Sequence, residues 1–259
     1  MEDILYEKRD HVARITINRE KVMNAFRAQT VEEMLLALRD ADNDDQIGAI
    51  VLAGAGQRAF CTGGDQSDHS GIYSGRGVAG IPIEELHFSM RNARVPLIAR
   101  VQGFAIGGGN VLATLCDITI ASTKAVFGQV GPRVGSVDPG FGTAYLSRVV
   151  GEKKAREMWY TCRRYSAPEA LAMGLANTVV EPEKLDETID QLCAEITSKS
   201  PTAIALAKRS FNADSDNIYG IGNQGLEALA LFYRTEESRE GVKAFMEKRT
   251  PDFRAARKR

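Results

Sequence analysis

The stretch PLIARVQGFAIGGGNVLATLCDITIAS, residues 96–122, reads as a buried strand, a glycine triplet that opens a helix, and a second buried strand. No hairpin signal separates the two strands. Upstream, the apolar run IGAIVLAGA at 47–55 reads as another strand, and the spacing predicts a helix over roughly 83–94. Strand, helix and strand alternating in this way favour parallel strands joined by helical crossovers. The sequence therefore predicts an α/β fold.

The residues before this core offer a hairpin, a helix and a long loop. Residues 4–19 contain two extended stretches around a polar turn, which predicts a hairpin. Thr30 and Glu33 match a capping box, and apolar residues at helical spacing follow, so we expect a helix of about ten residues there. Residues 56–80 are rich in Gly, Ser and Asp and have no sustained period, which predicts a long functional loop.

From Phe141 onward nearly every segment reads as helix, with one short strand at 175–180. Ser200 before Pro201 is a good N-cap and first-turn pair. We therefore divide the chain into a core with α/β character at 1–200 and a helical C-terminal region at 201–259.

The overall charge gives no reason to expect nucleic acid or a membrane surface as a partner. The 259 residues carry 33 Lys and Arg against 34 Asp and Glu. The apolar runs are too short to span a bilayer and the N-terminus is too polar for a signal peptide, so a cytoplasmic location is expected. Four scattered cysteines, with no CxxC and no histidine at ligand spacing, predict no metal site.

Two glycine-rich loops, FCTGGDQ at 60–66 and FAIGGGN at 104–110, each follow an expected strand. Glycine lets the backbone approach a ligand closely, and free N–H groups at a helix start can bind an oxygen. Neither loop has the spacing of a nucleotide phosphate site. Each loop by itself is also compatible with a simple tight turn.

The order FCTGGD, then a helix opened by GGG, then FGQ resembles the crotonase (enoyl-CoA hydratase/isomerase) superfamily over nearly the whole chain. The resemblance implies a crotonase-like ββα superhelix core that binds acyl-CoA, and a helical C-terminal region that builds trimers and then a hexamer. It also implies that one N–H from each loop, at Gly64 and Gly108, forms an oxyanion hole for the thioester carbonyl. One such donor is worth roughly a hundred- to a thousand-fold in rate. CoA enters as part of the substrate, and no tightly bound cofactor is implied.

The two glutamates that activate water in the family's hydratases are absent, since Val111 and Gly131 stand at those positions. The resemblance extends to a narrower branch of 2-ketocyclohexanecarboxyl-CoA hydrolases and 1,4-dihydroxy-2-naphthoyl-CoA synthases. It rests on GGDQ, GGGNVL, FGQVGPRVGSVD, VGEKKAREMW and TEESREG. Pro139-Gly140 and the short stretch SDHSGIYSGRG look more like the hydrolases.

We therefore expect ring-opening hydrolysis of 2-ketocyclohexanecarboxyl-CoA to pimeloyl-CoA through a thioester enolate, in alicyclic or benzoate degradation. The alternative is the Dieckmann-type ring closure of o-succinylbenzoyl-CoA that the naphthoyl-CoA synthases carry out. A third interpretation, from another class, is a non-catalytic homologue that binds acyl-CoA or RNA. Loss of both glutamates fits that interpretation, whereas the presence of Ser136, Asp138 and the entire GGDQ loop argues against it.

Asp138 lies in GSVDPGFG, residues 135–142, and has two interpretations. Asp-Pro-Gly is a good helix start, with Asp as N-cap and Pro139 as the first helical residue. A carboxylate at that point has a lowered pKa and is a weak base unless burial offsets the helix end. The resemblance instead makes Ser136 and Asp138 an active-site pair, in which Asp138 activates water or relays its proton. The two interpretations agree if the helix start aims the carboxylate.

Two tyrosines are further candidates for the site. The resemblance implies that Tyr233 enters from the C-terminal helices, commonly those of a neighbouring subunit, and it could otherwise be an interfacial core residue. Tyr73, in the loop after GGDQ, could close over the substrate ring, or it could be a mobile surface residue.

Space for a small anion is also implied. Thr62 belongs to the first glycine loop, and Gln129 is the glutamine of FGQ. In relatives with a glycine at the position of Gly131, a bicarbonate can bind beside that glutamine and serve as base. Phe141 replaces the tryptophan of those relatives, so the resemblance leaves bicarbonate open.

The CoA nucleotide needs cations near its phosphates and a pocket for adenine. The early loop EKVMNAFR resembles the family's CoA-contacting segment, and the basic end of the chain could add contacts from an adjacent subunit. The candidates are Lys21, Asn24, Ala25, Arg27, Lys248 and Arg249, each of which could also be an ordinary solvated residue.

Three other polar residues receive no catalytic role. We interpret Asp65 as a structural acceptor for the glycine turn. His69 and His87 are expected to face solvent or a helix surface.

Overall fold

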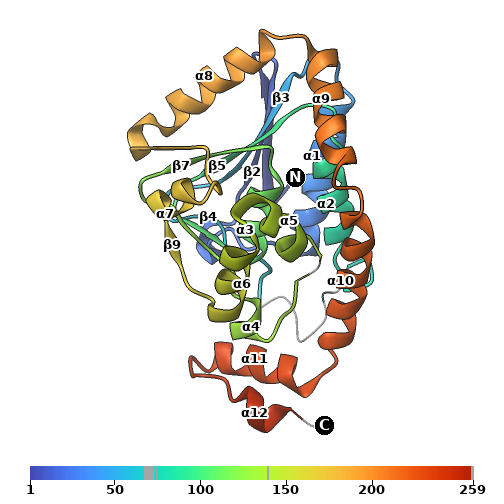
Figure 1. Ribbon diagram of the computed structural model, residues 1–259, viewed down its shortest axis with the longest axis vertical. Coiled ribbons are helices and arrows are strands. Elements are labelled where there is room, and N and C mark those ends of the chain that lie inside the picture. The colour runs from blue at the N-terminus through green and yellow to red at the C-terminus, as the bar shows by residue number, and fades with distance from the viewer. Residues whose placement is uncertain (67–72, 74, 139, 258–259) are drawn as a thin grey trace.

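The computed structural model describes residues 1–66, 73, 75–138 and 140–257, and it confirms the predicted α/β fold (Figure 1). A large sheet has the strand order β1-β2-β3-β5-β7-β10. The strands after β1 run parallel to one another, and β1 pairs antiparallel with β2. The strands are β1 (Ile4–Arg9), β2 (Val12–Ile17), β3 (Ala49–Gly54), β5 (Leu97–Val101), β7 (Ile118–Ser122) and β10 (Thr178–Val180).

The hairpin and the crossovers form where the sequence predicts them. Asp10 and His11 turn β1 into β2 with φ of 51° and 64°, the conformation that matches strand twist in two-residue turns. Helix α1 (Ala28–Asp42) follows β2, α2 (Ile83–Asn92) precedes β5, and α3 (Gly108–Leu115) leads from β6 to β7.

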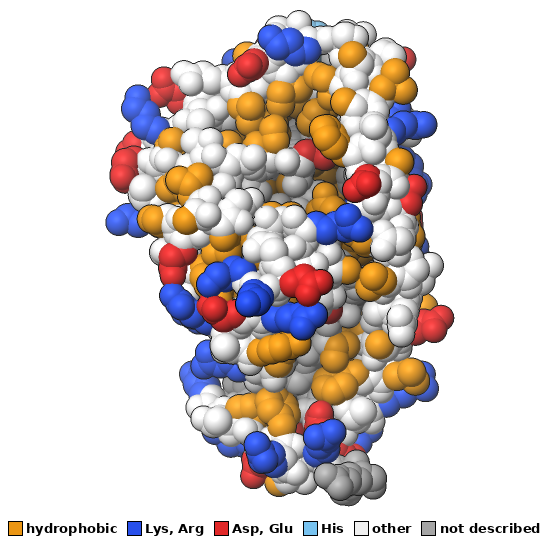
Figure 2. Space-filling view, in the orientation of Figure 1, with side chains coloured by type: hydrophobic (Ala, Val, Ile, Leu, Met, Phe, Trp, Pro, Cys, Tyr) orange, Lys and Arg blue, Asp and Glu red, His pale blue; other side chains and the backbone are white. Residues whose placement is uncertain are grey.

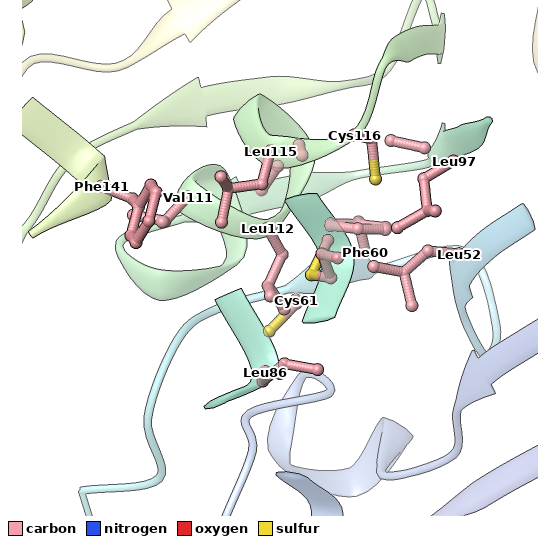
Figure 3. Packing of buried hydrophobic residues seen from close by; sticks show 14 of the residues in the cluster. Leu52, Phe60, Cys61, Leu86, Leu97, Val111, Leu112, Leu115, Cys116 and Phe141 are labelled. Carbon is pink, nitrogen blue, oxygen red and sulfur yellow. The ribbon is translucent and has the colours of Figure 1, made fainter. Parts of the chain in front are cut away.

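The large sheet separates two layers of apolar packing. On one face, Val51, Ile98 and Ile120 meet α8 (Leu185–Thr197), whose Leu185 and Ile189 are fully buried. On the other face the neighbouring side chains pack under α1, α2 and α3, and Figure 3 shows Leu52 and Leu97 beside Phe60 and Leu112. Strand residues alternate between faces, so adjacent residues such as Ile50 and Val51 belong to different layers.

A second, smaller sheet has the order β4-β6-β8-β9, and it was not expected. It comprises β4 (Ala59–Cys61), β6 (Phe104–Ile106), β8 (Val126–Gly128) and β9 (Tyr165–Ser166). Strand β4 lies within residues 56–80, which the sequence predicted to be a long loop. The prediction was therefore wrong for the first part of that segment. Runs of two or three residues are too short to show the alternation that marks a strand. Because β4 and β6 are parallel neighbours, the glycine loops that follow them leave the sheet side by side.

Helix α1 begins earlier than its capping signal indicates. Its first residue is Ala28, and the Thr30 hydroxyl accepts the N–H of Arg27 at 3.1 Å. The Glu33 carboxylate accepts the N–H groups of residues 2–4, with Asp3 N at 2.8 Å. The predicted Thr30–Glu33 capping box is therefore wrong, because Glu33 binds the start of the chain instead of a helix end.

The rest of the chain is mainly helical, as predicted from Phe141 onward. The Ser200 hydroxyl accepts the N–H of Ala203 at 3.3 Å, which confirms it as a cap. Within the described residues, no helix is both long and apolar enough to cross a bilayer. The remaining elements are η1 (Glu20–Val22), α4 (Gly131–Val134), α5 (Phe141–Val150), α6 (Glu152–Thr161), α7 (Ala167–Ala172), η2 (Pro182–Lys184), α9 (Pro201–Ala213), α10 (Ile218–Phe232), α11 (Glu236–Met246) and α12 (Phe253–Ala256).

A buried lysine fastens α9 to the core. Lys208 Nζ donates to Asp117 Oδ2 at 2.7 Å and to the Val95 carbonyl at 3.1 Å, and its side chain is 8% exposed. The Arg91 guanidinium of α2 donates to Ser215 Oγ at 2.7 Å, just before α10. These bonds fix the helices that lead to the C-terminus.

We predict that Lys208→Met lowers the free energy of unfolding by about 1–2 kcal/mol, because the Val95 carbonyl loses its donor and Asp117 its charged partner. Urea titration followed by circular dichroism measures the change. Lys199→Met, at an exposed position, is the matched control and should leave the urea midpoint unchanged. Equal midpoints for both variants would show that the buried lysine does not hold α9 in place.

Candidate active site

A cavity of about 570 Å³ lies where the two glycine loops meet. Its wall is completed by the segment before α1, the end of β8, α4 and the end of α10. The sequence-predicted residues that line it are Ala25, Thr62, Gly64, Tyr73, Gly108, Gln129, Gly131, Ser136 and Tyr233. The structure therefore brings together most of the candidates that lie near the motifs.

The glycine loops approach one another more closely than side chains would allow. A Cβ at Gly63 would lie 2.9 Å from Gly108 N, and a Cβ at Gly109 would lie 1.9 Å from the Cys61 carbonyl oxygen. Gly63 also has φ of 89°, which residues with a side chain rarely adopt. Glycine at these positions is what lets the end of β4 touch the start of α3.

Two backbone N–H groups are left free by this arrangement. Phe26 N donates to the Gly63 carbonyl and Asp65 N to the Phe26 carbonyl, both at 2.8 Å, and this bridge does not use the N–H of Gly64. Gly108 is the first residue of α3, and its N–H has no partner within the helix. Within the described part of the chain neither N–H donates a hydrogen bond, and both residues line the cavity. Two such donors can hold one developing oxyanion.

Asp138 supports the start of α5 but is not its N-cap. Helix α5 begins at Phe141 with Gly140 as N-cap, and Asp138 Oδ1 accepts the N–H of Gly142 at 2.8 Å. The predicted N-cap position was therefore wrong by two residues, although the carboxylate does bind a free N–H of the first turn. Pro139, expected as the first helical residue, lies outside the described residues.

Burial controls the acidity of this aspartate. Asp138 Oδ2 is buried and makes no hydrogen bond among the described residues. Burial raises the pKa of Asp138, and donors from Thr143 and Gly142 offset this only in part. Burial thus offsets the lowering expected at a helix end, because the cost of desolvating the charge exceeds the attraction of the helix. A carboxylate with a raised pKa is a better base.

The carboxylate lies directly behind the cavity wall. The lining includes Ser136, Val137 and Val111 but not Asp138 itself. A Cβ at Gly142 would lie 2.8 Å from Asp138 Oδ1 and 2.8 Å from Val111 Cγ2, so both atoms rest against the same glycine. Asp138 is therefore a neighbour of the cavity wall and not part of its lining.

The two predicted tyrosines are both buried against this site. The Tyr233 hydroxyl lies 3.4 Å from Ser136 Oγ, and burial raises the pKa of Tyr233, so it remains a neutral hydrogen-bond donor. It reaches Ser136 of its own chain, whereas the resemblance suggested a neighbouring subunit. Tyr73 is 6% exposed, which rules out an exposed surface residue, and its hydroxyl lies against the α-carbon of Gly64.

Several predicted CoA contacts are engaged elsewhere. Asn24 is fully buried and its amide donates to the carbonyls of Ala55 at 2.9 Å and Ala59 at 2.7 Å. The Arg27 guanidinium binds Asp3, with Nε to Oδ2 at 2.8 Å, at the start of α1. The remaining three cations lie outside the lining: Arg249 pairs with Glu240 and Glu247, and Lys21 and Lys248 are exposed.

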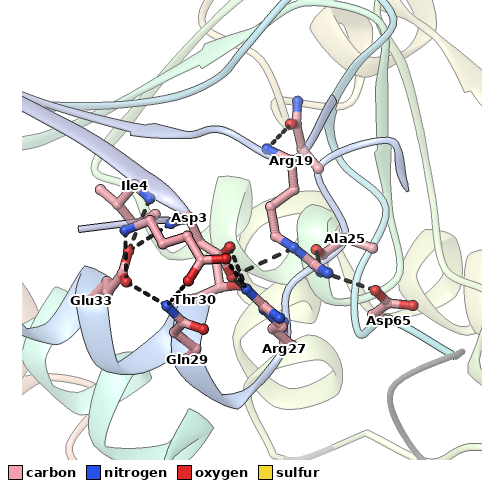
Figure 4. Close-up of polar contacts among 11 residues, drawn as sticks. Asp3, Ile4, Arg19, Ala25, Arg27, Gln29, Thr30, Glu33 and Asp65 are labelled. Carbon is pink, nitrogen blue, oxygen red and sulfur yellow. Dashed lines mark hydrogen bonds and ion pairs between the residues drawn. The ribbon is translucent and has the colours of Figure 1, made fainter. Parts of the chain in front are cut away.

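The first glycine loop is held by an ion pair that the sequence did not indicate. Arg19 Nη1 lies 3.0 Å from Asp65 Oδ2, and Arg19 Nε lies 3.5 Å from Asp3 Oδ2 (Figure 4). Asp3 also accepts from Thr30 and Arg27. This network joins the loop to the N-terminal hairpin and to α1, and it gives Asp65 a structural partner.

Two aromatic residues lie in the core, away from the cavity. The Phe141 ring is 1% exposed and packs edge-on against His87, with ring centroids 5.5 Å apart. His87 is buried, neither ring nitrogen has a partner among the described residues, and burial lowers its pKa to about 3. The expectation that His87 faces solvent or a helix surface was wrong. His69 lies outside the described residues.

Trp159 is the cavity residue that sequence reasoning missed. It is 9% exposed, lines the cavity, and donates through Nε1 to the Gly142 carbonyl. A Cβ at Gly131 would lie 3.0 Å from its Cζ3, so the indole occupies the space beside Gly131. The available signal was that this single tryptophan of the chain ends the motif VGEKKAREMW.

The cavity is mostly apolar. One acidic and one basic residue lie in the described lining. Asp65 pairs with Arg19, and Arg164 is exposed, with its Cζ 5.3 Å from the centroid of the Phe104 ring. Among residues 1–66, 73, 75–138 and 140–257, no cluster of His, Cys, Asp or Glu could hold a metal ion. Apolar walls with a few convergent donors suit an uncharged acyl group.

Comparison with known proteins gives one family. The sequence profile of the enoyl-CoA hydratase/isomerase family matches residues 7–256. A carnitinyl-CoA hydratase structure from Mycobacterium avium is 30% identical with a TM-score of 0.87, covering 98% of this chain and 99% of that one.

Two further solved structures are similar over nearly their whole length. An enoyl-CoA hydratase from Mycobacterium avium subsp. paratuberculosis is 25% identical with a TM-score of 0.88, covering 96% of this chain and 98% of that one. An enoyl-CoA hydratase/isomerase from Pseudoalteromonas atlantica is 26% identical with a TM-score of 0.89, covering 96% and 99%.

We predict that Asp138→Asn raises the melting temperature at neutral pH. The folded state binds the carboxyl proton more tightly than the unfolded state, so the wild type loses stability as pH rises through the raised pKa. Asparagine keeps an acceptor for Gly142 N–H and carries no charge. The difference should disappear at about pH 4 and be clear at about pH 7 by thermal scanning.

Asp252→Asn is the matched control, because Asp252 caps α12 at the exposed end of the chain and accepts the N–H of Ala255. That variant should not gain stability at neutral pH. A lower melting temperature for Asp138→Asn at neutral pH would contradict the prediction. It would mean that the ionised carboxylate stabilises the start of α5 by more than its burial costs.

Proposed function

This chain belongs to the enoyl-CoA hydratase/isomerase (crotonase) family, and we propose that it opens the ring of 2-ketocyclohexanecarboxyl-CoA by hydrolysis. Membership makes an acyl-CoA thioester the substrate class. The observation that carries the proposal is the pairing of two free N–H donors, at Gly64 and Gly108, with the Asp138 carboxylate behind a wall that lacks the hydratase glutamates. Val111 and Gly131 supply no carboxylate at those positions.

In the proposed reaction the thioester oxygen accepts the N–H groups of Gly64 and Gly108. Water adds to the ring ketone as Asp138 takes its proton, and the hydroxyls of Ser136 and Tyr233 donate to the ketone oxygen. The bond between that carbon and the α-carbon then breaks, and its electron pair forms the thioester enolate. Protonation of the α-carbon returns the proton and gives pimeloyl-CoA, so the product equals substrate plus one water.

The apolar lining supports this substrate over the synthase alternative. The ketocyclohexane ring is uncharged, whereas o-succinylbenzoyl-CoA carries a free carboxylate. Among the described lining residues the cation is Arg164, which is exposed and stacked on Phe104. An exposed cation stacked on a ring offers little to a buried carboxylate, which favours binding of the neutral substrate.

A bicarbonate base is not part of the proposal. Gln129 offers a buried Nε2 without a partner among the described residues. However, the Trp159 indole stands in the space beside Gly131, and Phe141 belongs to the core. We propose that Asp138 is the base, in which case added bicarbonate leaves the rate unchanged.

We predict that the purified protein converts 2-ketocyclohexanecarboxyl-CoA into a product heavier by one water with a new free carboxylate, measured by mass spectrometry. Asp138→Asn should lower the rate by about 100-fold or more, because the base is lost while its acceptor oxygen stays. Asp252→Asn should retain full activity.

Parallel reactions separate the competing functions. Cyclisation of o-succinylbenzoyl-CoA with loss of water, and no ring opening, would establish the synthase. Hydration of crotonyl-CoA would show hydratase chemistry without the usual glutamates. Tight binding of these thioesters with no turnover of any would identify a non-catalytic binder.

We also propose that residues 201–259 form the oligomerisation region of a hexamer. Figure 2 shows hydrophobic side chains on the surface between α8 and α9. Large apolar side chains are exposed on α9, α10 and α11, at Leu206, Phe211, Leu231, Phe245 and Met246. Exposed apolar residues of this number indicate a covered surface.

We predict a mass in light scattering of about six times the 28.3 kDa chain. Phe211→Lys with Leu231→Lys should give smaller species, because two exposed apolar contacts become charges. Tyr160→Lys, on the exposed surface of α6, is the comparison variant. A monomeric wild type would contradict the assignment.

A further inference from the structure

We propose that Trp159 is a positioning residue that aims the Asp138 carboxylate by fixing the backbone at Gly142. The inference deepens the proposed function, since it rests on Asp138 acting at the site. Two hydrogen bonds connect Trp159 on α6 with Gly142 on α5 and Gly142 with the Asp138 carboxylate.

Both hydrogen-bonding groups of Gly142 are engaged in this chain. Its N–H donates to Asp138 Oδ1 at 2.8 Å, and its carbonyl accepts the indole N–H of Trp159. Asp138 Oδ2 has no partner among the described residues. The direction of the carboxylate therefore depends on where Gly142 lies, together with Thr143, which also donates to Asp138.

Gly142 is also the point on which three side chains converge. A Cβ there would lie 2.8 Å from Asp138 Oδ1, 2.8 Å from Val111 Cγ2 and 3.1 Å from Trp159 Cζ2. The indole and the carboxylate thus approach the same α-carbon. Glycine has the greatest backbone freedom, and in the first turn of α5 the indole N–H adds a donor that holds this residue.

The indole also faces the acyl cavity on its other side. It lines the cavity and lies against Gly131. A substrate ring that enters the cavity would meet the indole before it meets the carboxylate. Trp159 therefore connects the shape of the acyl group with the position of the base.

The first experiment uses NMR of the indole N–H. Because Trp159 is the single tryptophan, indole-labelled protein gives one side-chain signal. We expect this signal to move with pH as Asp138 ionises, and to lose that step in Asp138→Asn. A signal that ignores pH, or that moves equally in the variant, overturns the inference.

Other ionisable groups of α6 and of the cavity also have shifted pKa values. The Cys162 thiol lies 3.7 Å from the Trp159 carbonyl, and burial raises its pKa above the usual range for a thiol. The pKa of Tyr233 is also raised by burial. Bonds from Tyr165 and Lys154 lower the pKa of Glu157, on the same helix as Trp159. Because these groups remain in Asp138→Asn, loss of the pH step in that variant assigns the step to Asp138.

The second experiment is kinetic. Trp159→Phe keeps an aromatic ring and removes the N–H, and we expect a roughly tenfold loss in kcat with KM nearly unchanged. In the Asp138→Asn background the same change should cause no further loss. Tyr160→Phe, at the next and largely exposed position, should keep wild-type kinetics.

The two experiments separate the two proposals. Equal losses from Trp159→Phe in both backgrounds would show that the indole does not act through Asp138. A wild-type protein without ring-opening activity would overturn the proposed function, and the indole titration would still decide whether Trp159 and Asp138 are coupled.

Discussion

The contact between two glycine loops is the constraint on which the rest of the site depends. Gly109 rests on the Cys61 carbonyl and Gly63 on the backbone of Gly108, at distances that exclude a side chain. The loops can meet because β4 and β6 are parallel neighbours, held by the apolar layer under the large sheet. Burial of that layer thus determines the separation of two N–H groups far apart in sequence.

The acidity of Asp138, the proposed base, is controlled by a competition between helix and burial. The first turn of α5 offers Asp138 a donor, which favours the charge, while the apolar surroundings disfavour it more strongly. Asp65, the other carboxylate near the cavity, has Arg19 beside it and serves to hold the loop. Two aspartates on the same cavity therefore have different tasks because their neighbours differ.

Much of this arrangement could be predicted from sequence, because hydrophobic period and glycine spacing report directly on strands, crossovers and loops. The short strands of the second sheet could not be predicted, since a strand of three residues such as Ala59–Cys61 has no period to read.

The start of α1 was misplaced because Glu33 binds the N-terminal backbone, a partner thirty residues away. His87 was misjudged because burial of polar side chains is decided by tertiary packing. Trp159 was missed because its hydrogen bond spans two helices.

The end of helix α10 connects the surface of the molecule with the cavity. Near its end Leu231 is 65% exposed, and two residues later Tyr233 is 7% exposed with its hydroxyl beside Ser136. One turn of chain thus presents an apolar side chain outward and a hydroxyl to the cavity. A rigid element of this kind transmits displacement from one end of its contacts to the other. In the proposed oligomer, a neighbouring chain that covers Leu231 would therefore press on the same element that places the Tyr233 hydroxyl beside Ser136.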